Sequence, residues 1–279
     1  MAISTAEVAK LRKMTGAGIT DCKKALEEAN GDYEQAIAII RKKGQLVAAK
    51  RADREANQGY VIAKLTGDAT KGVLTALCCE TESVAREAGF IKFTEDITEA
   101  SMQSGATNID AVKALIVNGI TVDEGVNEKR AVIGEKIDLT FFECLEAPEV
   151  VAYIHPGNKL ACLVGFNKKL ADPQVGRDIA MQTAAMAPVA VDKESVPADF
   201  IVKELEIATD QAKNDPKNAN KSDEMIEMIA KGKLEKIFKE MTLLNQDFIK
   251  DGKLKVADYL KAADKDLQVT KFVRFAFSS

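Results

Sequence analysis

Tryptophan is absent from this sequence of 279 residues, and histidine occurs only once, as His155. Any serine or cysteine nucleophile that needs a histidine as its base would depend on that one side chain. Cys162 lies on the neighbouring expected strand, but strand pairing alone can bring two such residues together. The sequence therefore predicts no catalytic residues, and we do not expect an enzyme.

Cysteine is scarce as well, because five residues are scattered along the chain without any C-x-x-C spacing: Cys22, Cys78, Cys79, Cys144 and Cys162. One histidine and scattered thiols lack the ligand spacing of a zinc site, so no metal is expected. The G-x-x-x-x-G-K-[ST] and G-x-G-x-x-G motifs, which hold nucleotide phosphates, are also missing. We expect no cofactor, and we interpret the thiols as small buried side chains in a reducing compartment.

Long apolar runs are missing too. No stretch reaches the roughly 18 uninterrupted apolar residues of a membrane-spanning helix, and the first residues lack the apolar run of a signal peptide. We therefore expect a cytoplasmic protein with no membrane partner. The formal net charge of −4 argues against nucleic acid as the main partner, although residues 1–55 carry a small basic excess.

Short amphipathic helices are expected in residues 1–55. Ser4 and Glu7 form a capping box, Gly16 and Gly18 permit a tight turn, and Asp32 can cap a third helix. The apolar residues recur at helical spacing: Val8 and Leu11; Cys22, Ala25, Leu26 and Ala29; Tyr33, Ala36, Ile37 and Ile40. The pattern predicts a small three-helix domain, and modules of this size usually bind partners.

The stretch RKKGQLVAAKRADR (41–54) follows the third helix. A basic strip for nucleic acid is one interpretation. A solvated helix extension and linker is the interpretation we favour, because few aromatic residues accompany the charges.

The hydrophobic period then changes to that of strands. Residues 59–65 and 72–79 are expected to form a hairpin, followed by a helix. The same order recurs with strands at 137–145, 149–156 and 159–166 and a helix after Asp172 and Pro173. The sequence thus predicts an α+β protein whose core has two related α+β subdomains, 56–140 and 141–279.

Residues 198–241 are expected to interrupt the second subdomain. Two amphipathic helices flank the polar segment NDPKNANKS, which contains a helix-breaking proline. Their apolar residues are expected to face one another: Phe200, Ile201, Leu205 and Ala208 against Met225, Ile226, Ile229, Leu234 and Ile237. The pattern predicts an antiparallel helical hairpin that projects from the core.

The junction CCETES after the second strand has two interpretations. Glu80 and Glu82 are two residues apart and could act as paired carboxylates. They could instead favour the N-terminal dipole of the helix that follows, which requires no chemistry. The acidic junction, helical module and hairpin together are typical of a protein that grips another protein at several places.

The stretch LRKMTGAGITDCKKALEEANGD resembles the N-terminal signature of the bacterial elongation factor Ts family. Twelve positions match at fixed spacing: Leu11, Arg12, Thr15, Gly16, Ala17, Gly18, Asp21, Cys22, Lys23, Lys24, Ala25 and Leu26. The resemblance continues in the same order to the closing segment KFVRFAF. It implies a guanine-nucleotide exchange factor that binds elongation factor Tu with bound GDP or without nucleotide and promotes GDP release during translation elongation.

The resemblance also implies roles for the parts. The first three helices correspond to a ubiquitin-associated-like domain that docks on the nucleotide domain of elongation factor Tu. The first core subdomain pushes a loop toward the magnesium and phosphate site, and the second holds the third domain of the partner. The hairpin adds contacts or forms a homodimer, depending on the species.

The inserted loop of the family reads T-D-F-V, which corresponds here to Thr81, Glu82, Ser83 and Val84. Glu82 keeps the carboxylate, but Ser83 replaces the phenylalanine that acts as a wedge. An alternative function is therefore a diverged protein that binds or chaperones elongation factor Tu with reduced exchange activity.

Five further residues correspond to partner contacts of the family. Tyr153 and His155 match a Y-x-H stretch near the wedge, and Arg12 matches a contact to the GTPase. Ile19 and Thr20 occupy contact positions where methionine is commoner. Ile19 keeps an apolar side chain there, and Thr20 places a polar one at the second position.

Overall fold

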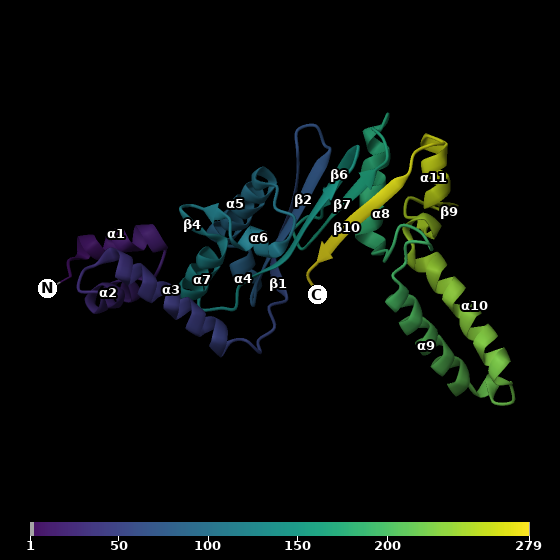
Figure 1. Ribbon diagram of the computed structural model, residues 1–279, viewed down its shortest axis with the longest axis horizontal. Coiled ribbons are helices and arrows are strands. Elements are labelled where there is room, and N and C mark those ends of the chain that lie inside the picture. The colour runs from purple at the N-terminus through teal and green to yellow at the C-terminus, as the bar shows by residue number, and fades with distance from the viewer. Residues whose placement is uncertain (1–2, 279) are drawn as a thin grey trace.

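The computed structural model describes residues 3–278 as mixed helices and antiparallel sheets, which confirms the expected α+β class. Figure 1 shows an elongated molecule, with three N-terminal helices at one end and a helical hairpin projecting near the other. None of the helices within residues 3–278 has both the length and the apolar composition needed to cross a bilayer.

Three helices form the N-terminal module: α1 (Thr5–Thr15), α2 (Ile19–Glu28) and α3 (Tyr33–Lys50). The expected capping box is present, because the Ser4 hydroxyl accepts from the N–H of Glu7 while the Glu7 carboxylate accepts from the N–H of Ser4. Gly16 ends α1 with φ of 70°, a conformation that costs glycine little. The apolar stripes of the helices meet in a small core around Leu11, Leu26 and Ile40.

The extension of α3 is helical as expected, but it is not solvated all round. One side packs on α7 (Val122–Ile133), where Gly44 is buried against the backbone of Asn127. Arg41 adds ion pairs to Glu124 at 2.8 Å and Glu128 at 2.9 Å. The expected solvated extension is therefore solvated on one side only. The sequence does not predict the docking on α7, because glycine has no side chain and leaves no hydrophobic pattern.

Two three-stranded antiparallel sheets form the core. The first has the order β1 (Gln58–Leu65), β2 (Lys71–Cys79), β5 (Asp138–Glu146). The second has the order β10 (Val269–Ala276), β7 (Leu160–Phe166), β6 (Glu149–Ile154). The boundary expected between residues 140 and 141 falls inside β5, which pairs with β2, so the chain changes sheet only after Glu146.

The sheets pack face to face through a shared apolar layer that includes Val61, Leu74, Leu145, Val150 and Leu163. The outer face of the first sheet is covered by α5 (Ala88–Ser104), α6 (Ile109–Lys113) and α7. The outer face of the second is covered by α8 (Pro173–Met186) and α11 (Val256–Ala263) (Figure 1). The core therefore has four layers: helices, sheet, sheet, helices.

The hairpin consists of α9 (Ala198–Asn214) and α10 (Asp223–Met241), joined by a polar tip with the short helix η1 (Pro216–Asn218). Ala208, Ala212, Ile226 and Leu234 are buried between the helices, but Met225 is 49% exposed and does not face α9 as expected. The remaining short elements are α4 (Glu82–Ala85), β3 (Ile116–Val117), β4 (Ile120–Thr121), η2 (Leu243–Asn245), β8 (Asp247–Phe248) and β9 (Asp251–Lys255).

Candidate partner-binding site

Residues 81–84, called here the 81–84 loop, begin two residues after the end of β2. Thr81 is extended and Glu82 starts the single turn of α4. Val84 is half-buried against the core and Ala85 is buried, so the turn is fixed on one side. Thr81, Glu82 and Ser83 are exposed on the other side. The backbone therefore exposes Ser83 to solvent.

The base of the loop is held by carboxylates. Glu135 accepts hydrogen bonds from the backbone N–H groups of Glu80 (3.2 Å) and Thr81 (3.1 Å) and from the Thr81 hydroxyl (2.8 Å). Glu80 accepts from Arg51 at 2.7 Å and from the N–H of Lys136 at 2.6 Å. Burial raises the pKa of Glu80, but the bonds from Lys136 and Arg51 outweigh it and leave this pKa below its usual value.

Glu82 points the other way and pairs with Lys159 at 3.2 Å and Arg86 at 2.8 Å. Its pKa is lowered by the hydrogen bonds from Lys159 and then from Arg86. Glu80 and Glu82 are therefore both held ionised by separate cations. This arrangement does not support the paired-carboxylate interpretation, because an acid–base pair needs one carboxyl with a raised pKa.

Lys159 lies in the turn between β6 and β7, so its contact with Glu82 brings this turn to the loop. Tyr153 and His155 lie at the same end of β6, with the Tyr153 Oη and His155 Nδ1 atoms 3.0 Å apart, within hydrogen-bond distance. His155 is exposed. Two of the expected contact residues thus lie at the strand end that leads into the turn contacting the 81–84 loop, about 70 positions away in sequence.

Arg12, Ile19 and Thr20 are exposed on the N-terminal module, where Ile19 is 59% exposed. They lie on either side of the turn between α1 and α2. The structure therefore places the expected contact residues in two groups, one on the module and one around the loop.

An open groove of about 980 Å³ runs between the N-terminal module and the first subdomain. Ser83 and Val84 line it on one side, and Met14, Thr15 and Gly16 line it on the other. The lining combines apolar side chains with charged ones. The apolar ones are Ile37, Phe93, Val117, Ile120, Val132 and Ile133, and the charged ones are Arg41, Glu87, Lys92, Asp96, Glu128 and Lys129. The candidate site therefore combines an exposed loop with an open groove.

The thiols do not form a reactive centre. Burial raises the pKa of Cys79 and of Cys162 to about 12, which keeps both protonated at neutral pH. Cys78 and Cys79 are only 5% and 0% exposed, because the central strand β2 is covered on both faces. Cys162 pairs in register with Tyr153 and its thiol donates to the carbonyl of Ala180, so it does not pair with His155.

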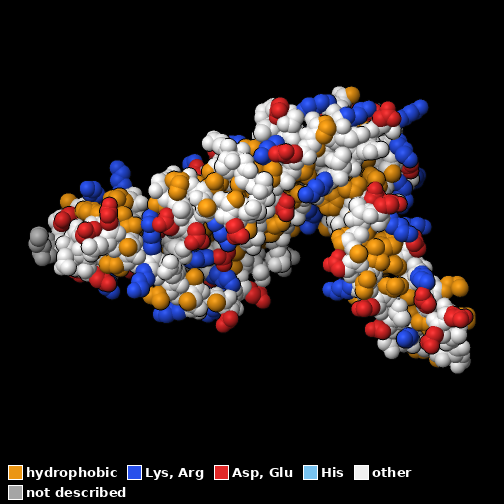
Figure 2. All heavy atoms as spheres, in the orientation of Figure 1, with side chains coloured by type: hydrophobic (Ala, Val, Ile, Leu, Met, Phe, Trp, Pro, Cys, Tyr) orange, Lys and Arg blue, Asp and Glu red, His pale blue; other side chains and the backbone are white. Residues whose placement is uncertain are grey.

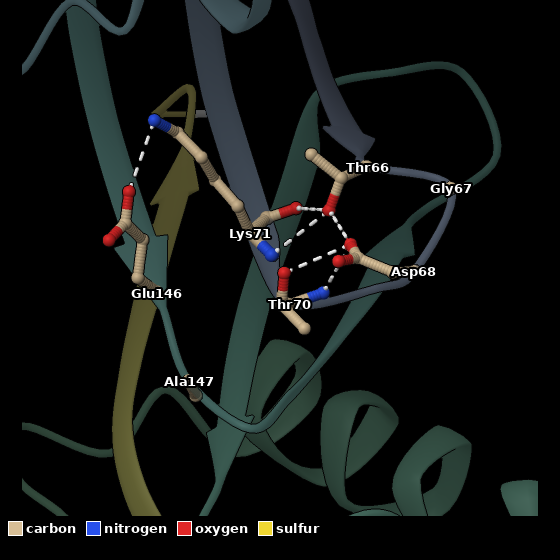
Figure 3. A pocket seen from close by; sticks show the side chains of 7 residues that line it. All are labelled: Thr66, Gly67, Asp68, Thr70, Lys71, Glu146 and Ala147. Carbon is tan, nitrogen blue, oxygen red and sulfur yellow. Dashed lines mark hydrogen bonds and ion pairs between the residues drawn. The ribbon is translucent and has the colours of Figure 1, made fainter.

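A second open cavity, of about 760 Å³, lies beside the turn between β1 and β2 (Figure 3). Asp68 accepts from the hydroxyls of Thr66 and Thr70 and from the Thr70 N–H, which lowers its pKa to about 2. Lys71 pairs with Glu146 across the strands at 3.1 Å. These polar groups form hydrogen bonds and an ion pair with one another. They therefore stabilise the turn and do not indicate a ligand site. Within residues 3–278 no cluster of histidine, cysteine and acidic side chains has the arrangement of a metal site.

Sequence reasoning did not identify the residues that hold the loop, namely Arg51, Glu135 and Lys159. Each is a charged residue in a turn or linker, and such residues are usually solvated. Only the place of Glu135 in the sequence could have indicated its role, because residues 135 and 136 lie just before β5, which pairs with β2.

Comparison with known proteins gives a consistent result. The family model described as elongation factor TS matches residues 80–279. A protein named elongation factor Ts from Christiangramia forsetii is 47% identical over 98% of both chains. Proteins of the same name from Porphyromonas gingivalis and Bacteroides fragilis are 45% and 38% identical over 98% or more of each chain. This chain therefore belongs to the elongation factor Ts family, and so to the translation elongation factors.

Proposed function

We propose that this protein is a guanine-nucleotide exchange factor that binds elongation factor Tu with GDP bound and promotes release of the nucleotide. The observation that carries the proposal is the 81–84 loop, which is exposed, anchored at its base and placed at the rim of the groove. Thr81 and Val84 are identical to the first and last residues of the loop that the family inserts. Glu82 keeps the carboxylate of the second residue.

The proposed action is physical rather than covalent. A translational GTPase retains GDP through backbone N–H groups of its phosphate loop and through Mg²⁺, which requires near-ideal octahedral geometry. A factor that binds preferentially to a distorted form of the GTPase weakens both. By linkage, each tenfold loss in GDP affinity corresponds to about 1.4 kcal/mol of coupling free energy.

The two groups of exposed residues support a contact at several points. On this proposal the N-terminal module is a ubiquitin-associated-like domain, and Arg12 and Ile19 contact the nucleotide domain of the partner. The two sheets with their helices act as two related subdomains. Tyr153 and His155 support the 81–84 loop from the second subdomain, which also holds the third domain of the partner.

On this proposal, the side chain at position 83 determines how much burial free energy is available to distort the partner. Burial of a phenylalanine side chain in a pocket contributes roughly 1.5–3 kcal/mol, whereas a serine contributes almost none of this. The main chain of the loop, Val84 and the N-terminal module must therefore supply the distortion in this protein.

The test is the release of fluorescently labelled GDP from elongation factor Tu, measured with the wild type, Ser83→Phe and Ser83→Ala. We expect the wild type to accelerate release and Ser83→Phe to accelerate it further, by about three- to twelvefold if half of the burial energy is realised. Ser83→Ala is the matched control, because it changes the hydroxyl without adding a ring, and it should behave as the wild type.

A stable complex without any acceleration by the wild type would overturn the exchange proposal. In that case a large gain with Ser83→Phe would identify the protein as a diverged binding protein that has lost its wedge. If the wild type does accelerate release, equal rates for the wild type and Ser83→Phe would show that contacts other than position 83 are sufficient for exchange.

A further inference from the structure

Where β2 ends and β5 begins, two carboxylates bond to the backbone of the opposite segment. Glu80 follows β2 and bonds to the segment before β5, and Glu135 in that segment bonds back. Cys78 and Asp138 form the last pair of the β2–β5 register, so residues 80 and 81 lie opposite 136 and 135. Beyond that pair, Glu80 accepts from the backbone of Lys136, and Glu135 accepts from the backbone of residues 80 and 81. Side chains thus replace the main-chain ladder where the strands diverge.

Thr81 has the position of a helix cap, but it does not cap α4. Its side chain forms no capping bond to the helix, and its hydroxyl donates to Glu135 instead. A helix of four residues has too few internal hydrogen bonds to fix its own direction. Burial of Val84 and Ala85 holds one side of α4, and Glu135 holds the point at which α4 leaves the sheet, so the place of Ser83 depends on both.

The same anchor reaches the linker. The Lys136 ammonium donates to the carbonyls of Ala52 and Arg54, and Arg51 is paired with Glu80. The segment after α3, the base of the 81–84 loop and the approach to β5 are thereby held at one point. A change at this point alters the loop without touching the surface that a partner meets.

The geometry points to Glu135 as a positioning residue for the 81–84 loop, which it orients through Thr81 for its action on a partner. The inference rests on the proposed exchange function. The Glu135 carboxylate accepts three hydrogen bonds, and hydrogen bonds to an ionised group are stronger than those between neutral groups. Its role is to pre-orient the loop before the partner arrives, so that no binding free energy is spent on ordering it.

The test uses the full chain and separates binding from action. The rate of GDP release from elongation factor Tu is measured over a range of factor concentrations, which yields a maximum rate and a half-saturating concentration. Glu135→Ala should lower the maximum rate by about fivefold or more while the half-saturating concentration stays within about twofold. Glu143→Ala is the control, because Glu143 is an exposed carboxylate on β5 itself, and both parameters should stay unchanged.

Milder variants test the route through Thr81. Glu135→Gln retains one acceptor oxygen and should fall between the wild type and Glu135→Ala. Thr81→Val removes the hydroxyl and should lower the maximum rate, whereas Thr81→Ser keeps the hydroxyl and should restore it. In the Glu135→Ala background, Thr81→Val should cause little further loss, because both changes break the same hydrogen bond.

Unchanged maximum rates in Glu135→Gln, Glu135→Ala and Thr81→Val would overturn the inference, as would an equal loss in Glu143→Ala. If Glu135→Ala fails to fold, the maximum rates of Glu135→Gln and Thr81→Val relative to the wild type decide whether the inference stands. Failure of the wild type to accelerate release would instead overturn the proposed function alone. Hydrogen exchange of the Glu80 and Thr81 amides then tests the anchor by itself, and equal protection in the wild type and Glu135→Gln would overturn it.

Discussion

At the scale of single residues, Asp178 on α8 shows how one buried carboxylate joins several segments. Its side chain is 6% exposed and accepts hydrogen bonds from Gln174 (2.6 Å), Lys250 (2.6 Å) and Tyr259 (2.8 Å). Burial raises the pKa of Asp178, but the bonds from Lys250, Tyr259 and Gln174 outweigh it, so the pKa is lower than usual. Burial and the bond to Asp178 raise the pKa of Tyr259 to about 12.

This arrangement predicts a specific response to acid. Because the folded state lowers the pKa of Asp178, its contribution to stability is full above the unfolded value of about 3.9 and is lost as the pH falls through the folded value. Asp178→Asn should lower the free energy of unfolding by about 1.5–3 kcal/mol at pH 7. The gap between the free energies of unfolding of wild type and variant should begin to narrow as the pH falls below about 4, as measured by urea unfolding from pH 3 to 7.

The exposed Asp210 on α9 provides a control. Asp210→Asn should leave the free energy of unfolding unchanged across the same pH range. A gap for Asp178→Asn that stays constant down to pH 3 would contradict the prediction.

The candidate site illustrates what single residues reveal before a structure is known. The 81–84 loop was found because its residue types match a family pattern at a strand end. Glu135 was not found, because one glutamate in a turn looks like any solvated charge. Its role depends on the pairing of β2 with β5, and residues 81 and 135 are 54 positions apart.

At the scale of the elements, two glycines in the middle of helices have opposite surroundings. A Cβ atom added at Gly44 in α3 would lie 1.8 Å from the carbonyl oxygen of Asn127 on α7. A Cβ atom added at Gly232 in α10 would have no neighbour within 4 Å. The first glycine lets two helices approach closely, and the second only weakens its helix.

Alanine at these positions should therefore change stability in opposite directions. Gly232→Ala should stabilise the protein by about 0.5–1 kcal/mol, because alanine is the better helix former. Gly44→Ala should destabilise it by about 1–3 kcal/mol, since α3 must move away from α7. Thermal unfolding of the two variants beside the wild type gives the comparison. Stabilisation by both would show that α3 does not depend on this close approach.

Helices and strands were predicted well where their signal is local. The caps at Ser4 and Asp32 and the alternation in the strands mark elements that the structure contains. The docking of α3 on α7 and the placement of β5 in the first sheet were not predicted. Both depend on which surfaces meet in the folded protein. Neither Gly44, which has no side chain, nor the choice of sheet for β5 leaves a periodic pattern in the sequence.

At the scale of the whole molecule, the apolar layer between the two sheets joins the halves of the core. Leu163 is fully buried in this layer, which contains residues of both sheets. Leu234 is buried within the hairpin instead. On the face shown in Figure 2, acidic and basic side chains are interspersed over the surface. Polar contacts of Lys159 with Glu82 and Gln58 add to the apolar layer between the halves.

A cavity in the shared layer should therefore weaken both sheets. Leu163→Ala should destabilise the core by about 2–5 kcal/mol and speed amide hydrogen exchange in β1, β2 and β7 alike. Leu234→Ala should speed exchange in α9 and α10 and leave the sheets unchanged. Faster exchange confined to β6, β7 and β10 after Leu163→Ala would show that the two halves are stable independently.

The pairing of β10 with β7 has a consequence for synthesis of the chain. Residues 269–276 complete the second sheet more than 100 positions after the strand they join. During translation the N-terminal module and the first sheet can form early, while the inner face of that sheet awaits its cover. Because such distant pairing is slow and leaves apolar surface exposed, we expect the chain to be prone to aggregation until β10 has been synthesised and has paired with β7.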